Sequence, residues 1–199
     1  MTNRYTPKET LINYFKNYFS LTQTEREALS ISFTERKVKR RGFILQQGEV
    51  CRHFSFVISG CFRMYAVDPA GKEHNIQFAA ENDWIADLGS FYAEKPSPVY
   101  IEAIESSEIL QINHADLLNL YINYHKFDRN FRIIIEQKYI ELQNRVLQNI
   151  SATAPERYQY FLEQHPKLAN RLPSTQIASY LGITPEFLSK IRKDLSYRP

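Results

Sequence analysis

The sequence predicts an α+β fold in which helices flank an antiparallel roll and two short helices close the chain. Three observations predict this class. Strand-like runs separated by turn residues fill residues 33–112, a spacing typical of antiparallel barrels and rolls. Residues 126–149 contain neither proline nor glycine, as one long helix requires. Residues 174–193 carry apolar residues at helical spacing on both sides of a glycine.

The composition is that of a globular chain with one or two domains. Of the 199 residues, 43% are hydrophobic and 14% are aromatic, which is enough for a sizeable core. No apolar run approaches the ~20 residues of a membrane span. The polar start of the chain, with Asn3, Arg4, Lys8 and Glu9, is unlike a signal peptide. We therefore expect a cytoplasmic protein with no membrane partner.

Two helices are predicted before the strands. The first begins at the capping box Thr6-Pro7-Lys8-Glu9, where proline takes the first helical position. The second follows residues 21–25 and runs to about Ser30. The apolar face of the first helix is formed by Leu11, Ile12, Phe15, Tyr18 and Phe19.

The strand region opens with an alternating segment at 38–41 and continues with five strand-like runs. Basic residues cluster at 37–41, and this cluster is either a nucleic-acid patch or, as we prefer, the solvated face of a strand. The turns are marked by Gly42, Gly48, Gly60, Gly71 and Asn82-Asp83. The five runs cover residues 54–58, 61–67, 74–78, 100–104 and 108–112.

Helices return after residue 113. A short helix is predicted from His114 to Tyr124 and a long one over 126–149. The long helix carries Ile135, Tyr139, Leu142 and Val146 at spacings of four, three and four, as in a coiled coil, while Phe131 and Ile134 broaden the stripe. A core helix would show the same spacing, but we favour dimerisation through this stripe.

A third capping box, Thr153-Ala154-Pro155-Glu156, begins a helix that ends near His165. We place a domain boundary at residues 151–154. The predicted organisation is a roll domain over 1–125, a long dimerisation helix over 126–150 and a C-terminal domain over 151–199.

The segment 174–193 is typical of a helix-turn-helix. Ala178 is small where two helices would cross, and Gly182 can adopt a positive φ in the turn. Thr184 and Pro185 are an N-cap and a first helical residue. The apolar residues are Ile177, Ala178, Leu181, Ile183, Leu188 and Ile191. An ordinary helical hairpin packed on a core is the alternative interpretation.

The residues outside that apolar stripe are short, polar or basic, which suits a helix entering a DNA major groove. On the second helix the 3.6-residue repeat is expected to place Phe187, Leu188 and Ile191 opposite the polar residues. The residues predicted to contact DNA are Ser174, Thr175, Thr184, Glu186, Ser189, Lys190 and Lys193.

The charge distribution agrees with this interpretation. The whole chain has a formal charge of +3, and residues 171–199 alone account for it, because the rest is neutral. Basic residues in this segment are Arg171, Lys190, Arg192, Lys193 and Arg198, against Glu186 and Asp194. This modest excess would give one copy weak affinity for DNA.

No pattern indicates a cofactor, a metal site or catalysis. Cys51 and Cys61 form no CxxC pair and are interpreted as small buried hydrophobic residues. His53 and His74 lack the neighbours that would mark a haem or zinc ligand. The chain has no phosphate-binding glycine loop and no nucleophile elbow, so we expect a protein that is not an enzyme.

The order of helix, roll, long helix and helix-turn-helix resembles the Crp–Fnr superfamily of bacterial transcription regulators over almost the whole chain. Besides the segment 174–193, the most specific resemblance is the glycine pattern Arg41-Gly42, Gln47-Gly48-Glu49, Phe56-Val57-Ile58-Ser59-Gly60 and Asp68-Pro69-Ala70-Gly71. The resemblance implies a double-stranded β-helix roll of the cyclic nucleotide-binding type, jelly-roll-like, and a dimer along the long helix. It also implies paired helix-turn-helices on palindromic double-stranded DNA, with RNA polymerase as a candidate partner.

The sequence departs from the family at the ligand pocket. Effector-binding members use a glutamate for the ribose and, ten residues later, an arginine for the cyclic phosphate. Asp87 and Ser97 stand at these positions, and Lys95 is expected to be solvated. Without the bidentate guanidinium a buried phosphate loses its main contact. We therefore predict a degenerate pocket, with an altered effector or none, formed by Asp87, Leu88, Gly89, Ser90, Ser97, Pro98 and Val99.

The resemblance also assigns roles on the second helix of the motif, where Glu186 and Lys190 resemble the base-reading residues. Ser174 and Thr175 stand at the start of the first helix, where hydroxyls and backbone N–H groups would contact phosphate. Only six residues follow Lys193, so we expect a helix-turn-helix without a full wing.

The sequence therefore predicts a DNA-binding transcription regulator. The alternative is a ligand-sensing or protein-interaction module that does not read DNA. Exposed aromatic residues on the helix over 184–193 would favour that alternative.

Overall fold

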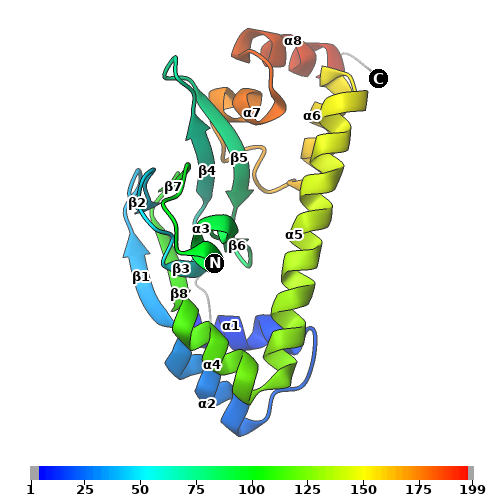
Figure 1. Ribbon diagram of the computed structural model, residues 1–199. Helices are drawn as coiled ribbons and strands as arrows, with labels where there is room; N and C mark the ends of the chain where they lie inside the picture. Colours follow the sequence, from blue (N-terminus) through cyan, green and yellow to red (C-terminus); the bar gives the residue numbers. More distant parts are fainter. Residues whose placement is uncertain (1–4, 197–199) are drawn as a thin grey trace. The chain divides into compact units, whose positions relative to one another are not determined.

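The structure is a computed structural model that describes residues 5–196 (Figure 1). The described residues do not include Asn3 and Arg4, which were used above as evidence against a signal peptide. They also do not include Arg198, which was counted in the charge of residues 171–199. Contacts divide the chain into two compact units, the first made of residues up to Met64 and Phe78–Ile135 and the second of Tyr65–Gln77 and the residues from Glu136 onward. Each unit is described by itself.

The N-terminal helices begin where the capping boxes predict. They are α1 (Pro7–Lys16) and α2 (Gln23–Ser32). In α1 the Thr6 hydroxyl accepts from the Glu9 backbone N–H, and the Glu9 carboxylate accepts from the Thr6 N–H at 2.7 Å. Thr22 and Glu25 form the same reciprocal pair at α2. These bonds satisfy amides that a helix start leaves unpaired.

The roll consists of two four-stranded sheets, ordered β1-β8-β3-β6 and β2-β7-β4-β5. The pairs β1–β8, β2–β7, β3–β6 and β3–β8 are antiparallel. In the β3–β8 pair, Phe54 lies opposite Ile112 and Phe56 lies opposite Leu110. The strands are β1 (Thr34–Val38), β2 (Phe43–Leu45), β3 (His53–Ser59), β4 (Phe62–Val67), β5 (Glu73–Ala79), β6 (Trp84–Ile85), β7 (Tyr100–Ala103) and β8 (Ser107–Asn113).

The predicted strand over residues 38–41 is wrong in position. Strand β1 ends at Val38, and the chain then turns, with the Gly42 N–H donating to the Lys39 carbonyl at 2.8 Å and Arg41 at a φ of 63°. Four exposed polar residues precede Val38 in the strand, so the period-two pattern that marks a half-buried strand is absent.

Aromatic residues form the core of the first unit. The Trp84 ring lies 4.9 Å from both Phe54 and Phe56, 5.2 Å from Phe131 and 6.2 Å from Phe15, measured between ring centroids. Phe131 belongs to the first part of α5, and Phe15 to α1. Helices α1, α2 and α4 (His114–Asn123) thus close one end of the sheet that contains β3 and β8 (Figure 1).

Gly60 connects β3 to β4 at a φ of +95°. A Cβ at this position would lie 2.1 Å from the Ser107 Oγ, so a larger side chain is excluded by space as well as by backbone conformation. This explains one glycine of the pattern on which the family resemblance rests.

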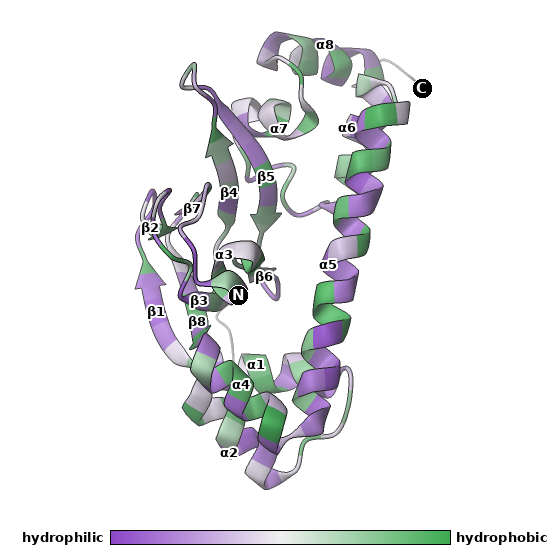
Figure 2. Cartoon of the chain, in the orientation of Figure 1, coloured by the Kyte–Doolittle hydropathy of each residue, from purple (hydrophilic) through white to green (hydrophobic). Residues whose placement is uncertain are grey.

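Helix α5 (His125–Ser151) is the longest in the described part of the chain and is continuous, as its composition predicted. Its first part packs in the first unit through the buried residues Phe127, Phe131 and Ile134. Figure 2 shows that stretches coloured as hydrophobic recur along the rest of the helix. Among residues 5–196 no helix is long and apolar enough to cross a bilayer.

The second unit contains α6 (Ala154–Gln164), α7 (Ser174–Leu181) and α8 (Pro185–Ser196) besides the later part of α5. The tip of the β4–β5 hairpin also belongs to it. The capping box at the start of α6 is present, with the Glu156 carboxylate accepting from the Thr153 N–H at 2.7 Å.

Candidate nucleic-acid interface and effector pocket

Helices α7 and α8 form the predicted helix-turn-helix. The turn contains Gly182 at a φ of 69°, a conformation that glycine adopts without a Cβ penalty. The Thr184 hydroxyl accepts from the Phe187 N–H at 3.2 Å, which is the predicted N-cap, and Pro185 begins α8. Ile177, Ala178 and Leu181 of α7 are buried, as are Leu188 and Ile191 of α8.

The opposite side of this motif is polar and exposed. All seven residues predicted to contact DNA are exposed, namely Ser174, Thr175, Thr184, Glu186, Ser189, Lys190 and Lys193. Four of these residues belong to α8, and the 3.6-residue repeat places them on one face of that helix. We call these four residues, Glu186, Ser189, Lys190 and Lys193, the reading face.

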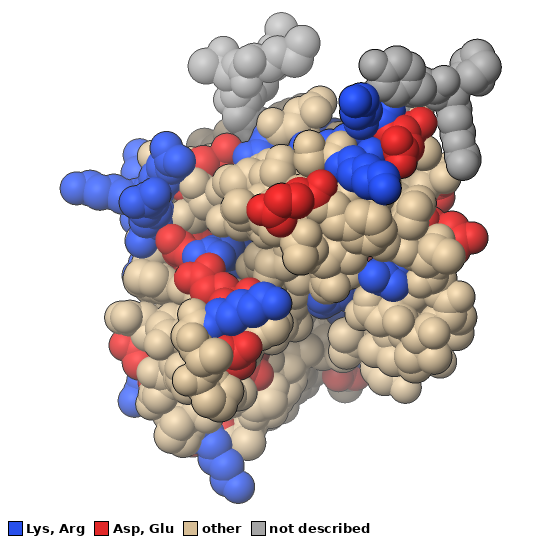
Figure 3. Space-filling view, turned by 90° about the horizontal axis from the view of Figure 1, so that it is seen from above, with Lys and Arg blue, Asp and Glu red and all other residues tan. Residues whose placement is uncertain are grey.

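The expectation that Phe187 lies opposite the polar residues is wrong. Phe187 is 44% exposed, because the helical repeat turns it about 100° from Glu186, which places it between the reading face and the buried side of α8. On the molecular face in Figure 3, Lys and Arg side chains lie among acidic and uncharged side chains.

Arg192 connects three helices of the second unit, a role that the sequence did not reveal. Its Nη1 donates to the Ser174 Oγ at 2.8 Å, and its Nε donates to the Tyr158 hydroxyl at 3.0 Å. The guanidinium also lies 5.5 Å from the centre of the Tyr158 ring. Ser174 is therefore fixed by Arg192 and keeps its hydroxyl proton available for donation.

The hairpin tip is hydrogen-bonded to α7. The Asn75 N–H donates to the Ser179 Oγ at 3.1 Å, and the Ser179 hydroxyl donates to the Glu73 carbonyl at 2.8 Å. The Asn75 Nδ2 donates to the Gln176 carbonyl at 3.1 Å, and Asn75 is only 2% exposed. We call this set of contacts the hairpin latch.

Arg145 of α5 completes the latch. Its Nη2 donates to the carbonyls of Asn75, at 2.8 Å, and Tyr180, at 3.0 Å, and its Nη1 donates to the Ile76 carbonyl. The guanidinium lies 4.0 Å from the centre of the Tyr180 ring, a cation–π distance. Burial lowers the pKa of Arg145, and Tyr180 partly opposes that shift.

In the first unit, the residues of the expected effector pocket bond to one another. Asp87 is the N-cap of α3 (Leu88–Ala93), and its Oδ1 accepts from the N–H groups of Gly89 and Ser90 at 3.1 and 3.3 Å. Its Oδ2 accepts from the Ser97 hydroxyl at 2.7 Å. The two positions that would hold ribose and phosphate therefore pair directly.

The rest of that loop is also held in place by hydrogen bonds. Ser97 is 2% exposed, and its Oγ accepts from the Val99 N–H at 3.2 Å. Ser90 donates to the Lys95 carbonyl at 2.5 Å and accepts from the Cys51 N–H at 2.9 Å. Leu88 is partly exposed, while Gly89, Lys95 and Pro98 are exposed.

A buried ion pair lies elsewhere in the roll and was missed from the sequence. The Arg63 Nε and Nη2 donate to the same Glu102 oxygen at 2.8 and 2.5 Å. Both residues are buried, and the two lie 39 positions apart in the chain. No local signal could have paired them.

The later part of α5 exposes apolar side chains. Tyr139, Leu142 and Val146 of the predicted stripe are exposed by 65%, 52% and 49%. The stripe continues beyond the prediction, and its exposed members on α5 are Tyr139, Ile140, Leu142, Val146, Leu147 and Ile150. We call these six residues the α5 apolar face.

The cysteines and histidines have ordinary surroundings. Cys51 and Cys61 are buried, as predicted, and neither forms a disulfide among the described residues. His74 lies 2.8 Å from the Asp68 carboxylate at the hairpin turn. Within residues 5–196, no group of three or more His, Cys, Asp or Glu side chains is arranged to hold a metal ion.

Comparison with known proteins agrees with this architecture. Residues 35–124 match the family described as "Cyclic nucleotide-binding domain". The probable transcriptional regulator flp of Lacticaseibacillus casei is 24% identical over 196 residues, which cover 94% of this chain and 85% of that protein.

Two solved structures share the fold. FixK2 from Bradyrhizobium japonicum superposes with a TM-score of 0.72 at 19% identity, covering 82% of this chain and 84% of that one. The c-di-GMP responsive global regulator CLP from Xanthomonas campestris has a TM-score of 0.69 at 15% identity, covering 88% and 92%.

These matches identify residues 35–124 as a domain of the cyclic nucleotide-binding type. Over nearly its whole length the chain is similar to a probable transcriptional regulator, and it shares its fold with FixK2 and with the regulator CLP.

Proposed function

We propose that this chain is a sequence-specific DNA-binding transcription regulator that acts as a homodimer in the cytoplasm. The observation that carries the proposal is the reading face of α8, which is exposed and polar on a helix held by a glycine turn and a threonine cap. Palindromic double-stranded DNA is the proposed partner, and RNA polymerase remains a candidate partner. We assign the chain no catalytic role.

The chemistry of the reading face supports base recognition. Glutamate can accept a hydrogen bond from the cytosine amino group, and lysine can donate to guanine O6 and N7. The exposed Phe187 can contact a thymine methyl group. Ser174 and Thr175 stand at the start of α7, where hydroxyls and backbone N–H groups suit phosphate.

The proposed dimer rests on the α5 apolar face. Its six side chains are 49–79% exposed in one chain, and apolar surface of this kind favours association. Two copies would also double the small positive charge that one reader brings to DNA.

We propose further that the roll acts as a scaffold with a degenerate pocket. Asp87 and Ser97 satisfy each other, so a cyclic phosphate would have to break that bond without gaining a guanidinium. Cyclic AMP is therefore not the proposed effector.

The alternative function is a protein-interaction module, and the exposed Phe187 is the observation that favours it. Selection from random DNA duplexes separates the two. A DNA reader should enrich an inverted repeat with half-sites about one helical turn apart, ~34 Å. Recovery of no common sequence would support the alternative instead.

A further inference from the structure

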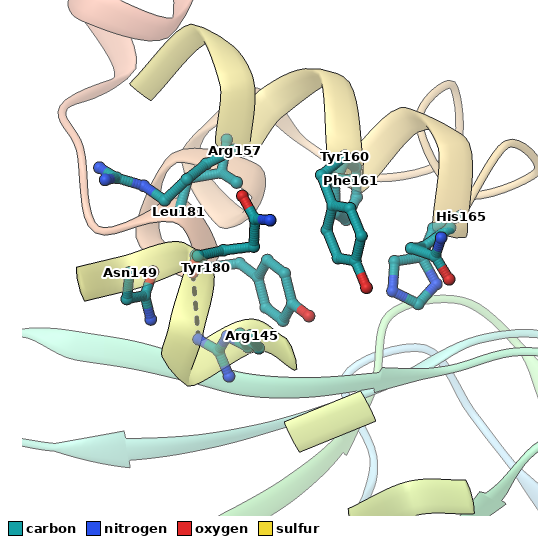
Figure 4. Close-up of a pocket in the computed structure, with 10 residues that line it drawn as sticks. Arg145, Asn149, Arg157, Tyr160, Phe161, His165, Tyr180 and Leu181 are labelled. Atoms are coloured by element: carbon teal, nitrogen blue, oxygen red, sulfur yellow. Dashed lines mark hydrogen bonds between the residues drawn. The ribbon is translucent and has the colours of Figure 1, made fainter. Parts of the chain in front are cut away.

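A hollow in the second unit lies among α5, α6 and α7 (Figure 4). Its volume is about 320 Å³, including space open to solvent. The hollow is lined by Arg145, Gln148, Asn149, Arg157, Tyr160, Phe161, Gln164, His165, Tyr180 and Leu181.

The charge of the lining is one-sided. It includes two arginines and no aspartate or glutamate. Arg145 bonds only to carbonyl oxygens, and the Arg157 Nη1 donates to the Ala152 carbonyl at 2.8 Å. Among the described residues, neither guanidinium has a carboxylate partner. Two cations beside one hollow without a counter-ion favour an anionic occupant.

The two arginines also leave donors unused. The Nε–H groups of Arg145 and Arg157 are buried and have no hydrogen-bond partner among the described residues. Buried donors are rarely left unpaired, because each costs desolvation energy. Both donors belong to side chains that line the hollow, so each guanidinium keeps unused hydrogen-bonding capacity beside it.

The rest of the lining combines aromatic residues with the amides Gln148, Asn149 and Gln164 and with Leu181. Phe161 lies 5.3 Å from His165 and 5.6 Å from Tyr180, measured between ring centroids. Figure 4 shows Tyr160, Phe161 and His165 extending from α6 on the side opposite Arg145 and Asn149, and we call this side the aromatic wall. Tyr160, His165 and Tyr180 are partly exposed and can contact a flat ring, whereas Phe161 is buried.

We propose that this hollow binds a small aromatic carboxylate, with the ring against the aromatic wall and the carboxylate near the two guanidiniums. The site would influence the reader, a consequence that rests on the proposed function. Arg145 both lines the hollow and donates to the Tyr180 carbonyl of α7. An occupant that binds the Arg145 guanidinium would therefore change the hydrogen bonds of the hairpin latch.

Calorimetry of the full chain with benzoate and 4-hydroxybenzoate tests binding without DNA. At least one of them should bind saturably, whereas neutral benzamide and inorganic phosphate should bind at least tenfold more weakly. Absence of saturable binding by both carboxylates, or equal binding of benzamide, would overturn the proposal. Equal binding of phosphate would show a simple anion site and would also overturn it.

Variants locate the site. Arg157→Gln removes the charge and keeps a polar amide, and should raise the dissociation constant at least tenfold. Lys167→Gln removes one charge from an exposed residue that does not line the hollow and should leave binding unchanged. Gln164→Ala provides a second lining variant if Arg157→Gln does not fold. Equal affinity in wild type and both lining variants would exclude this location.

The regulatory consequence has its own measurement. Saturating benzoate should change the affinity of the wild-type chain for its selected duplex, and the Arg157→Gln chain should not respond. Unchanged affinity with confirmed benzoate binding would overturn the regulatory consequence and leave the site. Absence of any selective duplex would count against the proposed function rather than against the site.

Discussion

Two charged residues of the reading face, Glu186 and Lys193, should respond differently to removal although both are exposed on α8. Glu186 stands in the first turn of the helix, where a side chain can reach a base edge. Glu186→Ala should relax base preference at one position per half-site by roughly 1–3 kcal/mol. Competition binding with duplexes altered at single positions measures this change.

Lys193 stands two turns later, where contact with phosphate is expected. Lys193→Ala should weaken binding to all sequences alike and reduce the dependence of log K on log salt by about one unit per subunit. Binding isotherms at several salt concentrations provide the slope. If Lys193→Ala and Glu186→Ala changed specificity and salt dependence identically, α8 would not read bases.

The bond between Ser97 and Asp87 leads to a prediction about nucleotides. Because this 2.7 Å bond joins the positions expected for phosphate and ribose, cyclic AMP and cyclic GMP should give no heat in calorimetry. A dissociation constant near or below ~10 μM, about −7 kcal/mol, would show that Lys95 or backbone N–H groups replace the missing arginine.

Residues with local roles could be predicted, and residues with distant partners could not. Thr6, Gly182 and Thr184 act on backbone within three or four positions, so their types and spacing reveal them. Arg145 bonds to carbonyls 35 to 70 positions away, and Arg192 to side chains 18 and 34 positions away. Nothing near either arginine in the sequence specifies those partners.

Among the elements, α5 offers the most direct test of assembly. Leu142→Asp with Val146→Asp places charge on the α5 apolar face and should abolish association, because each buried side chain contributes about 1.5–3 kcal/mol. Light scattering at tens of micromolar, roughly where such helices associate, should show a dimer for wild type and a monomer for the variant.

The control for that experiment lies on the other side of α5. Gln137 and Asn144 are exposed, and the helical repeat places them opposite Leu142 and Val146. Gln137→Asp with Asn144→Asp should therefore remain dimeric. A wild-type chain that is already monomeric at these concentrations would contradict the proposed dimer.

The hairpin latch should stabilise the second unit. Ser179→Ala removes the acceptor of the Asn75 N–H and the donor to the Glu73 carbonyl, so it should lower the free energy of unfolding by about 1–3 kcal/mol. Urea denaturation measures the loss. Ser189→Ala, at an exposed position of α8, should change stability by less than ~0.5 kcal/mol, and equal effects of the two would argue against the latch.

At the level of elements, long or strongly periodic segments were predictable and short ones were not. The capping boxes and the uninterrupted composition of α5 located helices to within a few residues. Strands β2 and β6 have only three and two residues, too few for a period to emerge, and their positions follow from pairing with distant strands. Strand β1 lacks alternation because only its last residue is buried.

At the level of the whole molecule, the proposed function requires the DNA-binding segments of two chains to act together. One C-terminal segment has little excess positive charge, and one α8 contacts only a few bases. A dimer through α5 would present two reading faces to two half-sites, so that the contacts of both contribute to a single binding event. Affinity and specificity should then depend on the dimer rather than on either chain alone.

The most direct test of this account is the specificity ratio of the full chain, measured by fluorescence anisotropy. The selected inverted repeat is compared with a scrambled duplex of the same composition at the same salt concentration. The account predicts that the repeat binds at least ~10³-fold more tightly, and that Leu142→Asp with Val146→Asp removes most of this preference. Equal affinity of the wild-type chain for both duplexes would contradict the proposal that α8 reads DNA.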